Sequence, residues 1–220
     1  MNPPILRSPS LKTAPTLSFY KLGCSKGGRK LFKNVDCTLE AGGWLYITGA
    51  NGVGKTSLLR MLCGLAPIET GEIYWNGAPI RSQREAYQHD LCYLGHLNAL
   101  QESMTVSENL LFITALGESQ VDDDQISEVL ARFGVGGRSQ QLVRHLSQGQ
   151  KRRVALARLA LSPARLWVLD EPFVAMDEAG IKMLADLIAD HLAHGGLTVL
   201  TSHQQVPIGC IPAQILELHA

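Results

Sequence analysis

Hydrophobic residues follow one pattern near the N-terminus and a different one later in the chain. Segments 16–22 and 31–39 have the composition of strands, with a Gly- and Lys-rich loop at 24–30 between them. Gly42-Gly43 predicts a turn into a continuous apolar run at 44–48. We expect the early strands to form an antiparallel sheet, followed by a buried strand.

After residue 48 a glycine-rich loop leads into an apolar, helix-like segment, which Gly64 and Pro67 end. Residues 71–77 predict a strand that ends in an Asn-Gly turn, and residues 91–94 predict another short strand. These segments continue the alternation of strand and helix.

A helical insert follows this first half. Thr105 and Glu108 form a capping-box pattern, and apolar positions recur at helical spacing from there to Leu116. The pattern stays helical to about Arg144, with an acidic start at 122–124 and a Gly-rich break at 134–137. The sequence therefore predicts a largely helical segment between two halves of an α/β core.

The second half returns to alternation. We predict helices at 148–161 and 178–194 and strands at 166–169 and 198–201, with 215–218 as a possible last strand of the sheet. Strands that alternate with helices favour parallel βαβ units with helices on both faces of the sheet.

The composition fits one globular domain. With 220 residues, 45% of them hydrophobic, the chain can bury a sizeable core, and 20 basic side chains balance 20 acidic ones, so nothing points to nucleic acid as a partner. Four prolines predict a flexible tail at 1–15, which leaves a single domain at 16–220. Five cysteines without a C-x-x-C pair favour reduced thiols in the cytosol. No apolar run reaches the roughly 18 residues of a membrane span.

The sequence GANGVGKT at 49–56 lies between the apolar run and a helix, which is the order of a phosphate-binding P-loop. Its glycines allow positive φ, so backbone N–H groups can converge on phosphates at the positive end of the helix. Lys55 would add a point charge for the β and γ phosphates, and Thr56 would offer a hydroxyl to Mg²⁺. We predict a nucleotide site formed by Gly49, Ala50, Asn51, Gly52, Val53, Gly54, Lys55, Thr56 and Ser57.

Two carboxylates end the buried strand LWVLDE. Because ligands of an open α/β sheet lie at the carboxyl ends of its strands, Asp170 and Glu171 are expected near the phosphates. Asp170 could hold Mg²⁺ or its water shell, and Glu171 could orient or deprotonate an attacking water. Alone, the motif would be a strand that ends in a solvated acidic turn; the P-loop 115 residues upstream favours the functional interpretation.

A second anion site is indicated where Ser147 and Gly149, in LSQGQ, begin the helix at 148–161. By itself, Ser147 would be interpreted as a helix cap that serves stability alone. The adjacent Lys151–Arg153 run is expected to be a solvated face, or charge beside a phosphate, instead of a nucleic-acid patch.

Together these motifs resemble the nucleotide-binding domain of ABC transporters. GANGVGKT, LSQGQ, LWVLDEP, VAMD (174–177) and TSH (201–203) have the order and spacing of that family, from about Thr16 to the C-terminus. The resemblance implies an α/β P-loop NTPase of the ABC ATPase type, with a RecA-like parallel-sheet core, an N-terminal antiparallel β subdomain and an inserted helical subdomain at about 97–150. It also implies an ATPase that uses ATP and Mg²⁺ and couples hydrolysis to transport.

The same resemblance implies a homodimer in which two copies pair head to tail. Each ATP would lie between the P-loop of one copy and Ser147, Gly149 and Gln150 of the other. Asp177 would match the loop that communicates across the interface, and His203 the histidine that contacts the γ phosphate. From the residues alone, His203 could equally be a satisfied strand terminus.

Two positions depart from the family pattern. The usual glutamine after the strand that enters the helical insert is replaced by His96, although Gln101 lies further along the same loop. The aromatic residue that stacks on adenine in many relatives should fall near 26–28, where none occurs. We hypothesise weaker discrimination of adenine.

Within the family, the short single cassette, YLGH, WNGAPI and QLVRHLSQGQKRRVALARL resemble the ATP-binding subunits of bacterial cytochrome c maturation, or haem exporter, complexes. That resemblance implies integral membrane subunits (CcmB, with CcmC and CcmD), release of the haem-loaded chaperone CcmE, and a peripheral position on the cytoplasmic face of the inner membrane. The alternatives are the ATPase subunit of a different ABC transporter and a soluble ABC ATPase that acts on ribosomes or DNA.

The chain itself is expected to handle ATP and not haem. His191 and His194 lie three residues apart on a predicted helix, but no cysteine partner or C-x-x-C-H motif accompanies them. We interpret them as part of a solvated helix end near the C-terminal dipole.

Overall fold

The computed structural model describes residues 14–117, 121–174, 176–203 and 208–219. Of the tail expected at 1–15, only Ala14 and Pro15 are among these residues, and Pro15 is buried. The rest of that expected tail lies outside the described residues, and the proposed domain boundaries stay predictions.

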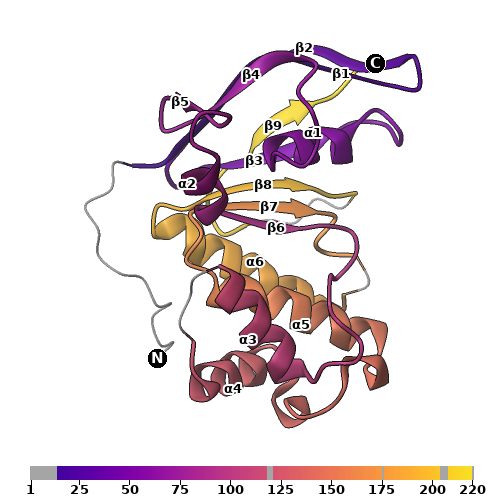
Figure 1. Cartoon of the computed structure of the whole chain (residues 1–220), viewed down its shortest axis with the longest axis vertical. Coiled ribbons are helices and arrows are strands. Elements are labelled where there is room, and N and C mark those ends of the chain that lie inside the picture. The colour runs from indigo at the N-terminus through magenta and orange to yellow at the C-terminus, as the bar shows by residue number, and fades with distance from the viewer. Residues whose placement is uncertain (1–13, 118–120, 175, 204–207, 220) are drawn as a thin grey trace.

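Two sheets form the framework of the molecule (Figure 1). The first is antiparallel, in the order β2-β1-β4-β5, and consists of β1 (Thr16–Lys26), β2 (Arg29–Glu40), β4 (Thr70–Trp75) and β5 (Ala78–Pro79). The second is parallel, in the order β6-β7-β8-β3-β9, and consists of β3 (Trp44–Thr48), β6 (Leu91–Leu94), β7 (Leu166–Asp170), β8 (Leu197–Thr201) and β9 (Gln214–Glu217). The predicted α/β class, with an antiparallel N-terminal sheet and a parallel core, is confirmed.

Six α-helices lie in the described part of the chain: α1 (Lys55–Leu62), α2 (Arg84–His89), α3 (Val106–Leu116), α4 (Asp123–Arg132), α5 (Gln148–Leu161) and α6 (Glu178–Ala193). Two 3-10 turns, Gly136–Arg138 and Val143–His145, separate α4 from α5. The predicted capping box of α3 is present, because Thr105 Oγ1 accepts from Glu108 N and Glu108 Oε2 accepts from Thr105 N. The helical segment expected before residue 144 is therefore confirmed.

Helices cover both faces of the parallel sheet. Helix α1 lies between the two sheets (Figure 1), and its buried side chains share one core with residues of β1, β2 and the central parallel strands. Helices α3 to α6 lie on the other face. This arrangement leaves the carboxyl ends of the parallel strands free to carry loops.

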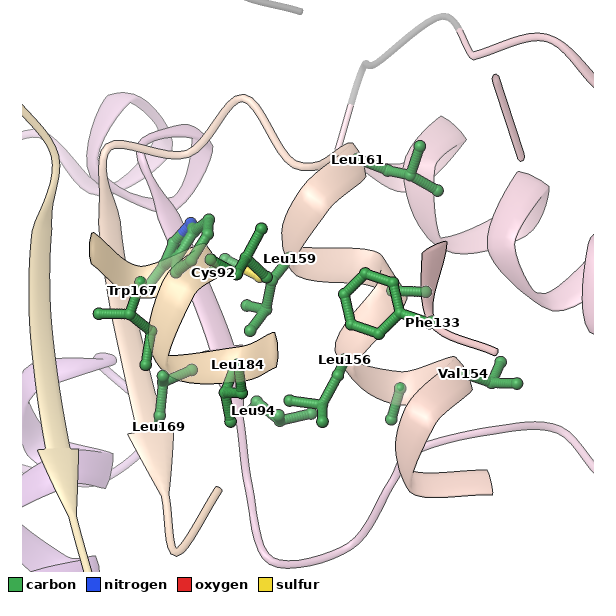
Figure 2. Close-up of a cluster of buried hydrophobic side chains, with 14 of the residues drawn as sticks. Cys92, Leu94, Phe133, Val154, Leu156, Leu159, Leu161, Trp167, Leu169 and Leu184 are labelled. Carbon is green, nitrogen blue, oxygen red and sulfur yellow. The ribbon is translucent and has the colours of Figure 1, made fainter. Parts of the chain in front are cut away.

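Helix α5 packs both against the sheet and against the helical segment. Figure 2 shows Leu156 and Leu159 of α5 in one cluster with Leu94 of β6, Leu169 of β7 and Leu184 of α6. Phe133, which follows α4, belongs to the same cluster. Because burying a leucine stabilises a fold by about 1.5–3 kcal/mol, this shared core fixes α5 firmly relative to β7.

The prediction of a loop at 24–30 is wrong. Strand β1 continues to Lys26 and β2 begins at Arg29, which leaves a two-residue turn. Gly27 (φ 57°) and Gly28 (φ 76°) both have positive φ, which this kind of hairpin turn requires. The short elements β5 and α2 were also missed by the sequence interpretation.

The expected solvated end of α6 is wrong for His191. The His191 side chain is fully buried, its ring stacks on Trp167 with centroids 3.8 Å apart, and its Nε2 lies 3.2 Å from the Leu197 carbonyl oxygen. Gly196 makes room for it, since a Cβ there would lie 2.3 Å from the imidazole. The chain turns back into β8 at this point and covers His191, so that of the two histidines only His194 is exposed.

Candidate functional site

The predicted P-loop joins β3 to α1. Gly49 (φ 132°), Gly52 (φ 80°) and Gly54 (φ 111°) all have positive φ, and Gly54 precedes the first residue of α1. A Cβ at Gly49 would lie 2.7 Å from the carbonyl oxygen of Leu218, the residue after β9, so the backbones approach too closely for any side chain there. The strand, glycine loop and helix therefore have the geometry that the sequence predicted.

Lys55 folds back over the loop that precedes it. Its Nζ donates to the carbonyl oxygens of Gly49, at 2.8 Å, and Ala50, at 3.4 Å. Asn51, Gly52 and the neighbouring Thr56 are exposed. The loop thus places the ammonium group of the half-buried Lys55 next to an exposed threonine at the start of α1, and an ammonium group, a hydroxyl and helix N–H groups are groups that bind phosphate and its counter-ion.

Strand β8 separates the P-loop strand from β7 and aligns the two ends. Thr201, the last residue of β8, is in register with Ile47 of β3 on one side and with Asp170 of β7 on the other. The arrowheads of β7 and β8 point to the same side in Figure 1. The P-loop and the Asp170-Glu171 pair therefore lie at one edge of the sheet.

Thr201 also connects the two carboxylate residues by hydrogen bonds. Its buried hydroxyl donates to Asp170 Oδ1 at 2.8 Å and accepts from the Glu171 N–H at 3.0 Å. Asp170 is itself 3% exposed, so this bond fixes a carboxylate that has lost most of its water. Sequence reasoning missed this role of Thr201, although the residue stands in the TSH motif.

Glu171 takes a backbone conformation that is rare for a non-glycine residue, with φ at 49°. Its Oε2 accepts from the His203 N–H at 3.2 Å, and its Oε1 lies 3.3 Å from His203 Nε2, which is an ion pair only when the imidazole is protonated. The structure thus brings together Glu171, which follows β7, and His203, which follows β8. Hydrogen bonds with Thr201 and His203 thus hold Glu171 in this strained backbone conformation, which is common where a functional side chain needs a fixed direction.

Ser147 and Gln150 form a capping box at the start of α5. Ser147 Oγ accepts from Gln150 N at 3.2 Å, and Gln150 Oε1 accepts from Ser147 N at 3.0 Å. Ser147 is exposed and Gly149 is half-buried. The cap leaves the serine hydroxyl able to donate outward, while the helix end supplies further N–H groups.

Asp177 caps the N-terminus of α6, where its Oδ1 accepts from the Gly180 N–H at 3.0 Å. Arg153 Nη2 donates to both oxygens of the same carboxylate, to Oδ1 at 2.7 Å and to Oδ2 at 2.9 Å. The Gly180 N–H and then the Arg153 guanidinium hold the pKa of Asp177 below its usual value, although partial burial opposes them. Asp177 is therefore tied to α5 within its own chain.

The prediction of a solvated face at Lys151–Arg153 is wrong. Lys151 bonds Glu102 at 2.5 Å and lowers the pKa of that carboxyl, and Arg153 bonds Asp177. Arg152 is only 5% exposed. Neighbouring segments cover this turn of α5, which a charge run cannot reveal, because the partners lie far away in the sequence.

The two departures from the family pattern have clear positions. His96 is exposed, two residues beyond β6, and its neighbour Leu97 is 80% exposed. Residues 26–28, which are the last residue of β1 and the two-residue turn to β2, include no aromatic side chain. An aromatic placed at Gly27 would be strained by its positive φ, so Lys26 is the better position for a test of adenine stacking.

Within the described residues, no cluster of three His, Cys, Asp or Glu side chains could hold a metal ion alone. Mg²⁺ commonly needs only one or two protein ligands beside phosphates and water, so Thr56 and Asp170 still fit it. All five cysteines are free, and burial raises the pKa of the Cys37 thiol to about 11. None of the described helices has the length and apolar character to cross a membrane.

The chain belongs to the ABC transporter family, whose sequence profile matches residues 32–174. It is an ABC-type ATPase. A solved structure, a putative ABC transporter ATP-binding protein from Pyrococcus furiosus, superimposes with a TM-score of 0.80 at 26% identity, over 93% of this chain and 98% of the other.

Among curated relatives, the chain is 76% identical to the cytochrome c biogenesis ATP-binding export protein CcmA of Albidiferax ferrireducens. The match covers 96% of this chain and 100% of the relative. The protein of the same name from Dechloromonas aromatica is 51% identical, over 85% of this chain and 92% of the relative.

Proposed function

We propose that this ABC ATPase is the ATP-hydrolysing subunit of a membrane complex for cytochrome c biogenesis. The observation that carries the proposal is 76% identity, along 96% of the chain, to a relative named as the ATP-binding export protein of that process. The YLGH loop and the run LVRHLSQGQKRRVALARL support the same branch. A different ABC transporter is the alternative.

In the proposed site, the P-loop residues 49–57 bind the phosphates of ATP. Thr56 and Asp170 would hold Mg²⁺, directly or through its waters, and the ion would neutralise charge on the phosphates. Glu171 orients or deprotonates the attacking water, and His203 contacts the γ phosphate while it holds the Glu171 carboxylate.

The functional unit in this proposal is a homodimer. Ser147, Gly149 and Gln150 of one copy close the site over the ATP that the other copy's P-loop holds, and Asp177 communicates between the two sites. The exposure of Ser147 at one helix N-terminus and of Asn51, Gly52 and Thr56 beside another supports this arrangement, because a helix N-terminus that is open to solvent can bind a phosphate.

The partners in this proposal are integral membrane subunits of the CcmB type, with CcmC, CcmD and the haem chaperone CcmE. The chain would then lie peripherally on the cytoplasmic face of the bacterial inner membrane. It would not bind haem through His191, since that side chain is buried and its ring stacks on Trp167.

Affinity purification of the tagged chain from detergent-solubilised membranes tests the proposal. We expect a CcmB-type subunit to co-purify and ATP hydrolysis to be retained. Recovery of a permease of another transport system instead would contradict the cytochrome c assignment and support the alternative.

In the same complex, His96→Gln is expected to alter the Mg²⁺ dependence of ATP hydrolysis or its coupling to the membrane subunit. An unchanged rate of hydrolysis with and without the membrane subunit would show that position 96 is inert.

A further inference from the structure

Arg152 lies in the first turns of α5 and is almost completely buried, with 5% of its surface exposed. Its guanidinium donates in three directions. Nη2 reaches the Glu171 carbonyl oxygen at 2.9 Å, Nε reaches the Pro172 carbonyl oxygen at 3.4 Å, and Nη1 reaches both the Gly95 carbonyl oxygen and Asn98 Oδ1 at 3.3 Å. One side chain thus joins two loops that leave the neighbouring strands β6 and β7.

The bond to the Glu171 carbonyl completes the restraint of that residue. Its N–H is held by Thr201 and its carboxylate by His203. Its carbonyl oxygen accepts from Arg152 Nη2 at 2.9 Å and from the Val174 N–H at the longer distance of 3.3 Å. A positive φ at a glutamate persists only where the surroundings enforce it. The guanidinium, which makes the shorter of the two bonds to this carbonyl, is therefore one of the groups that set the direction of the Glu171 side chain.

A role in stability alone explains this arrangement poorly. All four acceptors of the guanidinium are neutral oxygens, and burial lowers the pKa of Arg152 while only the Asp170 carboxylate opposes that shift. A buried cation without a directly bonded carboxylate costs desolvation energy that an apolar side chain would avoid. A planar fork of donors is, however, well suited to hold several oxygens in one fixed geometry.

We propose that Arg152 is a positioning residue for ATP hydrolysis, which aims Glu171 and couples it to the exposed segment 95–98. A shift of segment 95–98 pulls on Nη1, and the rigid guanidinium carries the shift to the Glu171 and Pro172 carbonyls. Leu97, at the tip of that segment, is 80% exposed and open to contact from outside. The inference rests on the proposed catalytic role of Glu171.

Arg152→Lys tests the positioning role. Lysine keeps the charge but cannot reach three separate oxygen groups from one planar fork. We expect kcat for ATP hydrolysis to fall by about ten- to a hundred-fold, because small misplacements of a catalytic group have effects of that size. KM for ATP should change by less than about three-fold, since the P-loop is untouched. Arg132→Lys, the same change at an exposed position of α4, should leave both constants unchanged.

Coupling is tested by a double-mutant cycle with Asn98→Ala, which removes one acceptor of Arg152. We expect kcat of Asn98→Ala to fall several-fold in the presence of Arg152 and to be unaffected in the Arg152→Lys background. Effects that multiply independently would overturn the coupling, and wild-type kcat in Arg152→Lys would overturn the positioning role. If Arg152→Lys does not fold, wild-type kcat in Asn98→Ala overturns the inference by itself.

Failure of this inference can be told from failure of the proposed function. Glu171→Gln, measured in parallel, should lose hydrolysis whatever Arg152 does. Loss of activity in Glu171→Gln with normal kcat in Arg152→Lys rejects only the role of Arg152. Normal activity in Glu171→Gln rejects the catalytic assignment on which the inference rests.

Discussion

Replacing Lys55 by alanine is expected to lower ATP hydrolysis by at least about a hundred-fold and to weaken ATP binding greatly. The Lys55 ammonium lies over the carbonyl oxygens of Gly49 and Ala50, where the phosphates are expected. Removing a charge that stabilises the transferring phosphoryl group typically costs 10²–10³ in rate, roughly, and here it also removes ground-state attraction. Phosphate release and titration with a fluorescent ATP analogue measure the two effects.

Lys182→Ala is the matched control for this substitution. Lys182 lies on the exposed side of α6 and bonds Asp186 four residues on, in a surface pair that contributes little to stability. Its removal should leave hydrolysis and ATP affinity unchanged. Wild-type turnover in Lys55→Ala would show that the P-loop assignment is wrong.

Glu171→Gln is expected to bind ATP, to lose hydrolysis by about 10²–10⁴-fold and to accumulate as an ATP-bound dimer. Glutamine has nearly the same shape, and its side-chain oxygen can still accept from the His203 N–H, so the strained turn should persist. It cannot take a proton from water. Light scattering after size exclusion, with and without ATP, would detect the dimer.

Glu128→Gln, an exposed change on α4, serves as the control and should hydrolyse ATP normally. A Glu171→Gln chain that stays monomeric in saturating ATP would argue against a site shared between two copies. One that hydrolyses ATP at the wild-type rate would remove Glu171 from the mechanism.

Much of the fold could be predicted, because its signals are local. The strand at 44–48, the strand at 91–94 and the helix at 148–161 have the bounds that apolar periodicity and capping residues indicated. The α3 capping box was readable for the same reason, since its partners lie within four residues of each other.

The features that were missed depend on contacts between distant residues. The sequence predicts a solvated helix end at His191, but the chain returns into β8 there and Leu197 contacts the imidazole. The sequence also predicts a solvated charge at Arg152, but segments 95–98 and 171–172 surround its guanidinium. The pairing of Thr201 with Asp170 joins positions 31 residues apart on neighbouring strands. Local sequence patterns do not reveal contacts between residues that lie so far apart in the chain.

The P-loop motif predicts a nucleotide site, and several residues of that predicted site are open to solvent in one chain. Asn51, Gly52 and Thr56 are exposed, and so is Ser147, the second residue of LSQGQ. In the proposed dimer, each copy contributes a P-loop to one site and Ser147 to the other.

Mixing two inactive variants tests this shared site most directly. Lys55→Ala disables the P-loop, and Ser147→Arg blocks the helix end, so each variant alone should be inactive. In a mixed pair, one site combines both defects while the other has an intact P-loop and an intact Ser147. Hydrolysis should therefore return on mixing, to about a quarter of the wild-type rate if chains exchange freely. A mixture as inactive as its components would contradict a site shared between two copies.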